Sequence, residues 1–571
     1  MSSNENGCVT DKKESIPTES RPFGLDDILV KIGEFGKFQF RFVVVIIFLI
    51  AFHTIVKYGF IFTASTVVYR CRVPECDGTE NFYQQPWTDF TIPKTASGQL
   101  EKCQRFKTFN STNTSSENVC YATNYDQESR TGCGTDFIFR DKEVTIAHDF
   151  KVFCSDEWKL AIVGSTNNLG QVIGIPLGGY ISDRYGRSKV LACAALASAI
   201  IGVVRSFSIN LYMFAFLGCL DNVFGSTIYG TAFVLAMEFI GPNVRSYTGT
   251  LLPMFGGISR FLLGLAAKNF LNWRLIERIL YIPALGFIAL PWILPESVRW
   301  LLSHEKEEEA TKILRRAAKI NKRKLSDASI EKLLQANRKT ISGVETNKSQ
   351  LVEAFKVFPW RIMNCSFCWF STIFIFMGLS LNLSLLGRNR YNSFMYLGLI
   401  EIPGTLLPPM TINRFGRKYS LCGFMFLTGI FITAMTFVPS DSGTTRLVLY
   451  LLGKMFITGV FQIIYIFTSE VFPTSARNSL LAFCSMFGRF GSMIAPQTPL
   501  MAKYYASAPG ILFASSAFLS GSLVLFLPET NNVVLPTTLK DAENIGQKEI
   551  KIQPDTETEA QETLLTSKAE K

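Results

Sequence analysis

Long apolar runs separated by short polar segments make up most of the chain. A bilayer core about 30 Å thick needs roughly 20 apolar residues of α-helix. Twelve stretches approach that length and predict transmembrane helices at residues 42–66, 158–181, 190–208, 211–236, 246–267, 278–295, 361–383, 391–411, 419–438, 446–468, 479–500 and 508–527. The pattern therefore predicts an all-α integral membrane protein with twelve transmembrane helices.

The polar stretches divide the chain into regions with different expected roles. We expect a cytoplasmic N-terminus at 1–41, a first transmembrane helix at 42–68, an extracellular loop at 69–157, the rest of a six-helix half at 158–300, a cytoplasmic linker at 301–360, a second six-helix half at 361–530 and a disordered cytoplasmic tail at 531–571. Within the first region, residues 23–33 predict a short amphipathic helix on the membrane surface.

Charged motifs recur in both halves. Asp183-Arg184-Tyr185-Gly186-Arg187 follows the second predicted helix, and Asn413-Arg414-Phe415-Gly416-Arg417 follows the eighth. Glu238 precedes Arg245 by the same interval as Glu470 precedes Arg477. The nearly constant offset indicates duplication of a six-helix unit. We expect ion pairs among these charges to form a cytoplasmic gate; the alternative is simple anchoring of the loops.

The distribution of charge sets the orientation. Only 18% of residues are charged and 48% are hydrophobic, and the net charge is +11. The basic residues cluster in alternate loops, which predicts that both termini lie in the cytoplasm. We expect the protein to lie in the plasma membrane. They form no continuous face for nucleic acid.

The segment between the first two predicted helices carries the marks of an extracellular loop. It holds six cysteines, an even set that predicts disulfides of undetermined pairing: Cys71, Cys76, Cys103, Cys120, Cys133 and Cys154. Asn110 and Asn113 begin two glycosylation sequons. Cys365 and Cys368 lie in an apolar run, where they are expected to be buried hydrophobic side chains.

Several motifs resemble a known family. Asp183–Lys189 resembles the loop 2–3 motif of the major facilitator superfamily. Other segments are similar to the organic cation, carnitine and organic anion transporters of solute carrier family 22: Phe23–Gln39, Tyr69–Pro74, Met237–Gly241, Pro295–Leu301, Ile400–Gly404 and Glu470–Asn478. The resemblance runs from about residue 23 to 530 and implies transport of small organic ions by alternating access.

Ionisable residues inside predicted helices are candidates for substrate binding, because burying them in lipid is costly. Lys454, Phe461 and Tyr465 share one stripe of the tenth helix with Thr458, while Arg489 and Glu401 lie deep in the eleventh and eighth. The resemblance implies that an arginine at position 489 belongs to carriers of zwitterions or anions, such as carnitine-like compounds. The alternative is that Arg489 and Glu401 merely neutralise one another.

Other polar residues depart from the family pattern. Lys57 and His53 lie in the first helix, and Asp221 and Arg260, in the fourth and fifth, are at depths that allow them to pair. Such a pair is either structural or part of the substrate site. Asn168, like its neighbours Asn167 and Gln171, either faces the substrate or bonds helix to helix.

Competing functions are less consistent with these features. A polyspecific organic cation transporter is the main alternative, followed by a sugar porter and a non-transporting sensor. The chain has three histidines and no nucleotide-binding loop or nucleophile motif, so we expect no enzyme, metal site or cofactor. The expected partners are a small organic ion and membrane lipid. Any coupling ion is undetermined.

Overall fold

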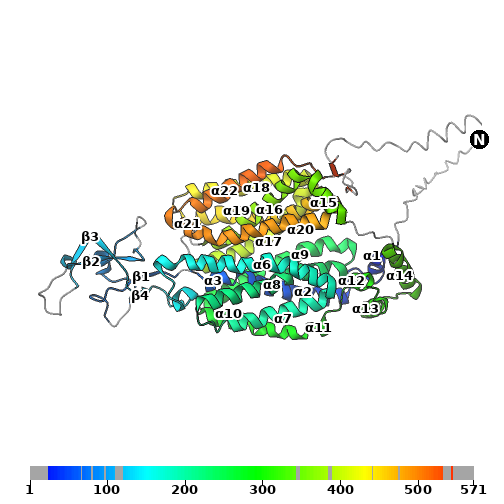
Figure 1. Ribbon diagram of the computed structural model, residues 1–571, viewed down its shortest axis with the longest axis horizontal. Helices are drawn as coiled ribbons and strands as arrows, with labels where there is room; N and C mark the ends of the chain where they lie inside the picture. The colour runs from blue at the N-terminus through cyan, green and yellow to red at the C-terminus, as the bar shows by residue number, and fades with distance from the viewer. Residues whose placement is uncertain are drawn as a thin grey trace, which may run out of the picture.

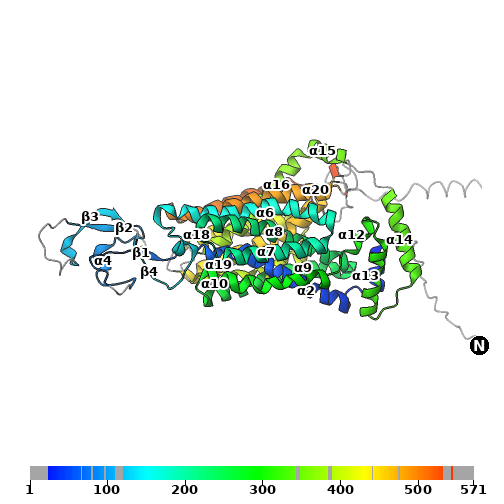
Figure 2. The same ribbon diagram turned by 60° about the horizontal axis from the view of Figure 1, so that its bottom comes forward.

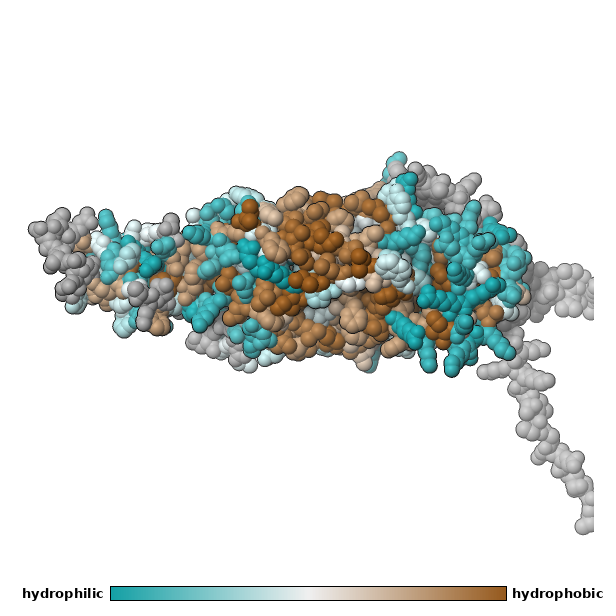
Figure 3. Space-filling model, turned by 90° about the horizontal axis from the view of Figure 1, so that it is seen from below, coloured by the Kyte–Doolittle hydropathy of each residue, from teal (hydrophilic) through white to brown (hydrophobic). Residues whose placement is uncertain are grey.

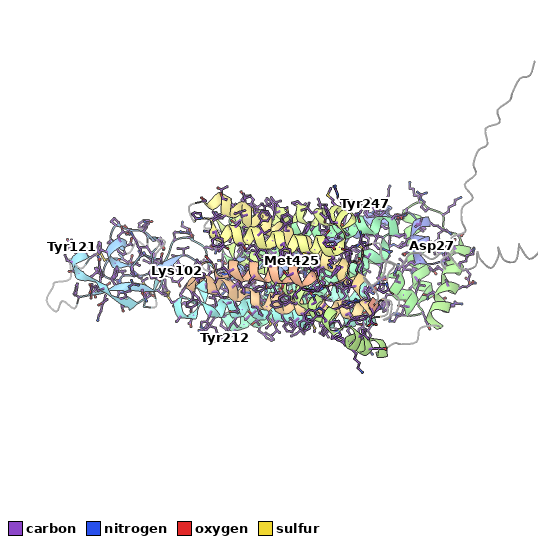
Figure 4. All side chains as sticks on the ribbon, turned by 90° about the horizontal axis from the view of Figure 1, so that it is seen from above. Asp27, Lys102, Tyr121, Tyr212, Tyr247 and Met425 are labelled. Atoms are coloured by element: carbon purple, nitrogen blue, oxygen red, sulfur yellow. A yellow bond between two sulfur atoms is a disulfide. The ribbon has the colours of Figure 1, made fainter. Side chains whose placement is uncertain are left out.

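The computed structural model shows a helical bundle with a small domain of strands at one end and short helices at the other (Figure 1). It describes residues 23–543 except for 66, 79–81, 96–97, 99, 110–119, 135, 343–347, 384–388, 440–441, 474–475, 532–535 and 537–541. We call the end with the strands the loop side and the opposite end the linker side. Tyr121 lies at the loop side and Asp27 at the linker side (Figure 4).

The first half of the bundle contains the helices expected from the first six apolar runs. They are α2 (Lys37–Tyr58) with its continuation α3 (Phe60–Thr63), α6 (Trp158–Tyr185), α7 (Arg187–Arg205), α8 (Leu211–Phe239), α9 (Pro242–Asn269), and the interrupted series α10 (Trp273–Tyr281), η3 (Pro283–Ala289) and α11 (Leu290–Ile293). The sixth run is interrupted where Pro283 and Pro291 lack the amide hydrogen that an α-helix requires.

The second half repeats this arrangement. It comprises α16 (Pro359–Leu381), α17 (Arg390–Phe415), α18 (Arg417–Phe437), α19 (Gly443–Val471), α20 (Arg477–Ile494), η5 (Ala495–Gln497), α21 (Thr498–Tyr504) and α22 (Ala508–Val524). Within the described residues, eight helical segments are long and apolar enough to cross a membrane. The other predicted spans coincide with α6, α17, α20 and α22. Of these, α22 has only 17 residues, and α6 and α17 include prolines.

Two large hydrophobic cores fill the bundle. One joins α2, α7, α8 and the linker helices, and the other joins α16 to α22 and includes residues of the first half such as Phe62 and Leu263. The two halves lie side by side, the first below the second in Figure 1, and in the turned view of Figure 2 the first half comes forward and overlaps the second. On the face shown in Figure 3, apolar residues cover the middle of the bundle and polar residues gather toward its two ends, as expected for a protein in lipid.

The loop side carries a small domain of two antiparallel strand pairs. Strand β1 (Tyr69–Cys71) pairs with β4 (Phe137–Phe139), and β2 (Gln104–Thr108) pairs with β3 (Tyr125–Gly132). Short helices α4 (Thr88–Thr91) and η1 (Ala122–Asn124) lie between the strands, and α5 (Ile146–Asp149) and η2 (Cys154–Asp156) lead from β4 to α6. The six cysteines are joined as Cys71–Cys133, Cys76–Cys120 and Cys103–Cys154. The sequons at Asn110 and Asn113 lie outside the described residues.

The linker side is built from short helices of the linker and the amino-terminal segment. They are α1 (Leu25–Lys31), α12 (Val298–Ser303), α13 (Glu307–Ile320), α14 (Asp327–Ser342) and α15 (Lys348–Val357). The apolar residues of α1, Leu25, Ile28 and Leu29, are buried in the core of the first half together with Leu314 of α13. The prediction that this helix lies on the membrane surface is therefore wrong: its apolar face is covered by protein.

Asp26 fixes α1 to the first half. Its carboxylate accepts hydrogen bonds from Arg245 at 2.9 Å and Arg299 at 2.8 Å. Burial alone would raise the pKa of the Asp26 carboxyl, but these two guanidinium groups outweigh it and hold that pKa below its usual value. Asn321, which follows α13, adds bonds to the backbone of Phe38 and Ile32. The amino-terminal segment is therefore part of the folded body.

Candidate functional site

A buried carboxylate lies between two cations where the halves meet. Glu401 on α17 forms ion pairs with Arg260 on α9, a helix of the other half, and with Lys454 on α19, whose Nζ lies 3.3 Å from a Glu401 oxygen. Lys454 Nζ also donates to the Phe376 carbonyl oxygen at 2.8 Å and to the Ser380 hydroxyl at 2.9 Å. All three charged side chains are buried, so each depends on the others for compensation.

Two further cations face the same region. Lys57 Nζ on α2 lies 5.4 Å from the centre of the Tyr58 ring, and the Arg260 guanidinium lies 4.8 Å from the same centre. Arg489 is half-buried on α20, and no ion pair joins it to an acid among the described residues. The alternative that Arg489 and Glu401 neutralise one another is wrong, because Glu401 is taken by Arg260 and Lys454. Among the described residues, Lys57 and Arg489 are thus basic side chains of this region without an acidic partner.

Aromatic rings border this charged group. Tyr465 packs edge-on against Trp369 at 4.5 Å between ring centroids, and Phe461 stacks on Phe376 at 5.6 Å. The Arg260 guanidinium lies 4.8 Å from the centre of the Tyr58 ring, and Lys454 Nζ lies 3.3 Å from the centre of the Phe376 ring. The predicted stripe of Lys454, Phe461 and Tyr465 is thus brought together with Glu401. Trp369 and Phe376 were not predicted.

His53 lies beside this group and has a partner of its own. Its Nδ1 lies 2.9 Å from the carbonyl oxygen of Gly225, and its ring lies 5.5 Å from the ring of Tyr229. Tyr58, also on α2, lies against the Arg260 guanidinium. The charged group therefore meets α2, and α8 bonded to it, on the side of the first half.

Asp221 belongs to a separate buried network. Arg205 donates to Asp221 at 3.1 Å and to Glu277 at 2.9 Å, while the Tyr281 hydroxyl donates to Asp221 at 2.6 Å and Ser198 donates to its other oxygen. The expected Asp221–Arg260 pair is therefore wrong, because each residue has a different partner. Arg205 and Glu277 lie near the ends of apolar runs, where a charged residue is ordinary in a membrane protein. The sequence therefore did not predict that they are buried partners of Asp221.

The side chain of Asn168 makes its hydrogen bonds within α6, and the neighbouring Gln171 reaches α8. Gln171 donates to the Asn168 side chain at 3.2 Å and to Asn222 on α8 at 3.4 Å, while Asn168 donates to the backbone of Gly164. The Gln171–Asn222 bond connects α6 to α8, as the helix-to-helix alternative expects for Gln171. The role of Asn168 in substrate binding stays a prediction.

The repeated charged motifs form equivalent clamps in the two halves. Arg187 pairs with Glu238 at 3.0 Å and with Asp183 at 3.4 Å, while Glu296 accepts the backbone amides of Arg187 and Ser188. Arg417 likewise pairs with Glu470 at 3.0 Å, and Glu529 accepts the amides of Arg417 and Lys418. Each clamp holds three helix ends of one half, and neither bridges the halves.

The remaining residues of the predicted gate differ in their surroundings. Arg184 contacts Tyr180, Arg414 lies over the Phe415 ring, and Arg245 holds Asp26. Asp183 keeps 71% of its side chain exposed. Two nitrogens of Arg477 are buried without a hydrogen-bond partner among the described residues. The gating role of these charges therefore stays a prediction.

Contacts between the halves gather toward the loop side. The Ser165 hydroxyl on α6 donates to the Met493 carbonyl oxygen at 2.8 Å and accepts from Gln497 at 2.9 Å. Phe62 packs edge-on against Phe394 at 4.8 Å. For the described residues, the ion pairs and side-chain hydrogen bonds that join the two halves all lie here or at the Arg260–Glu401 pair. The structure is thus closed at the loop side.

No group of histidine, cysteine and acidic side chains in the described residues is arranged to hold a metal ion. Cys365 and Cys368 are buried free thiols among apolar neighbours.

Comparisons with known proteins agree on a transporter family. The family described as "Sugar (and other) transporter" matches residues 96–558. "Solute carrier family 22 member 3" of Mus musculus is 31% identical over 545 residues, which cover 92% of this chain and 96% of that protein. "Organic anion transporter 3" of Oryctolagus cuniculus is 31% identical over 551 residues, covering 94% and 97%.

A solved structure supports the fold. The partially occluded inward-open form of the xylose transporter XylE from E. coli superposes with a TM-score of 0.57 at 18% identity, covering 87% of this chain and 100% of that one.

Proposed function

Since this chain belongs to solute carrier family 22, within the sugar (and other) transporters of the major facilitator fold, we propose that it carries small organic anions across a membrane by alternating access. One observation supports this choice of charge. Four basic side chains, Lys57, Arg260, Lys454 and Arg489, lie in the part of the bundle where Glu401 pairs with two of them, Arg260 and Lys454. A cation entering there would be repelled, whereas an anion would offset the excess positive charge.

Lys57 and Arg489 are the proposed contacts for the anionic group of the substrate, because neither has an acidic partner among the described residues. Arg489 can hold a carboxylate by two parallel hydrogen bonds. The rings of Phe461 and Tyr465 offer an apolar surface to the rest of the molecule. The same rings suit a quaternary ammonium group. A zwitterion such as a carnitine-like compound is therefore the second candidate.

The proposed topology follows from charge and sequence. Twelve spans place the disulfide-linked domain outside the plasma membrane and both termini inside, with the linker at 301–360 between the halves. In that orientation the loop side is the outer side. Because the loop side is closed, the structure is inward-facing. We propose that closure of the linker side brings Asp183, at the end of α6, toward Arg477, at the start of α20, because α6 and α20 already lie together at their other ends.

Uptake into proteoliposomes tests the proposal. An aromatic monocarboxylate, carnitine and tetraethylammonium are compared for the wild-type protein, Arg489→Ala and Arg489→Asp. A charge-assisted hydrogen bond contributes about 1.5–3 kcal/mol, so Arg489→Ala should weaken anion binding by about 10- to 100-fold. Lys107→Gln removes an exposed cation of the loop domain and serves as the control. Preference for tetraethylammonium in the wild-type protein would contradict the proposal.

A further inference from the structure

We propose that Glu401 is a tethered anion, which holds Arg260 in the empty carrier and is displaced from it by the anionic group of the substrate. This inference rests on the proposed function and deepens it. It assigns Glu401 the role of a competitor for substrate, and it makes the Arg260–Glu401 pair a contact that substrate breaks.

The pair joins the two halves at mid-depth. Arg260 comes from α9 of the first half and Glu401 from α17 of the second. Arg260 is 7% exposed and Glu401 is 3% exposed, so water cannot replace either partner. An unpaired charge in such a place is costly. When the site is empty, the only acid bonded to Arg260 among the described residues is Glu401, and the pair therefore forms.

The pairing is incomplete, which leaves room for a second anion. Arg260 Nε is buried and has no hydrogen-bond partner in the described part of the chain. A guanidinium offers several N–H donors in one plane, and a free carboxylate can align with two of them. The Glu401 carboxylate is confined by its attachment to α17. A diffusing substrate has no such restraint and can approach both Arg260 and the neighbouring cations.

Lys454 is a second cationic partner for Glu401. Its ammonium is fixed by the Phe376 carbonyl oxygen and the Ser380 hydroxyl, and already lies 3.3 Å from Glu401. When substrate takes Arg260, Glu401 remains paired with Lys454, so neither carboxylate is left without a cation. Both Lys454 and Glu401 belong to the second half. Substrate binding to Arg260 therefore breaks the Arg260–Glu401 pair between the halves and keeps the Lys454–Glu401 pair within the second half.

Glu401→Gln tests the proposal by removing the charge of the competitor and keeping its size. A competitor that occupies the site reduces the apparent affinity for substrate in proportion to the fraction of carriers that it leaves free. We expect the KM for uptake of an aromatic monocarboxylate to fall at least threefold, with a smaller change for Glu401→Asp. Glu277→Gln is the matched control, because it removes a buried carboxylate of the separate Arg205 network and should leave this KM unchanged.

A second readout needs no substrate. Ser165 lies in the closed contact between α6 and α20, so a cysteine there reports opening of the loop side through alkylation. In the empty carrier, that cysteine should react faster with Glu401→Gln than with Ser165→Cys alone, and Glu401→Gln without Ser165→Cys gives the background from the other cysteines. A KM that is unchanged or higher, or unchanged alkylation, overturns the tethered-anion proposal. Absence of anion uptake by the wild-type protein would instead overturn the proposed function.

Discussion

At the scale of single residues, two groups of buried charges inside the helical bundle have opposite excess. In the group between the halves, the Glu401 carboxylate pairs with both Arg260 and Lys454. The network inside the first half has one guanidinium, Arg205, against the carboxylates of Asp221 and Glu277. Only the first group touches both halves, and an excess of one charge there can be offset by a molecule that enters. The second group holds α7, α8 and α10 together.

The Arg205 network gives a prediction about stability. Arg205→Ala leaves two carboxylates buried without a cation, whereas Asp221→Asn leaves one guanidinium with one carboxylate. Removing one partner of a buried pair typically costs about 3–5 kcal/mol. Arg205→Ala should therefore lower the thermal stability of the purified protein much more than Asp221→Asn. Size-exclusion chromatography after heating measures this. Equal losses in the two variants would contradict the assignment.

At the scale of elements, the contact between α9 and α17 depends on glycine. A Cβ on Gly398 would lie 2.7 Å from the carbonyl oxygen of Gly257, and a Cβ on Gly257 would lie 2.6 Å from that of Gly398. Such distances are shorter than van der Waals contact, so any side chain must push the helices apart. These two helices come from different halves, and their close approach is part of loop-side closure.

Gly398→Ala should therefore favour opening of the loop side. Overpacking of this kind costs about 1–3 kcal/mol, and here the cost applies only to the closed form. We expect faster alkylation of a cysteine at Ser165 and slower uptake. Gly423→Ala is the control, because a Cβ on Gly423 of α18 has nothing within 4 Å. If both alanine variants behaved like the wild-type protein, the glycine contact would not govern closure.

At the scale of the whole molecule, the loop domain connects the two halves. Val144 donates its amide to Leu271 and accepts from the amide of Trp273, which fixes the end of this domain to the first half. The adjacent Glu143 forms an ion pair with Arg390, the first residue of α17 in the second half. The pair crosses the closed face, so opening of the loop side must break it.

Charge reversal tests this connection. Glu143→Arg and Arg390→Glu should each increase alkylation of a cysteine at Ser165, because like charges then meet across the closed face. The double reversal should restore the wild-type rate, with a coupling energy of about 0.5–3 kcal/mol. Additive effects of the two single changes would show that the residues act independently.

The sequence alone determined the periodic, lipid-facing pattern of the fold. Apolar runs of membrane length predicted the helices because every backbone group in lipid must be bonded within its helix, which makes length and hydropathy decisive. The recurrence of Arg187 and Glu238 as Arg417 and Glu470 likewise indicated equivalent contacts, and the structure shows them in both halves. These features depend on residues near one another in the chain or on a repeat.

Only the tertiary structure decided which buried charges meet. Arg260 pairs with Glu401, 141 positions away, and Asp221 pairs with Arg205 instead. Depth along a helix can be read from the sequence, but the rotation of each helix and the choice of its neighbours depend on packing. The same holds for α1, whose apolar face packs on protein where its amphipathic pattern equally suited lipid. A pattern states that a surface is apolar, and packing determines what covers it.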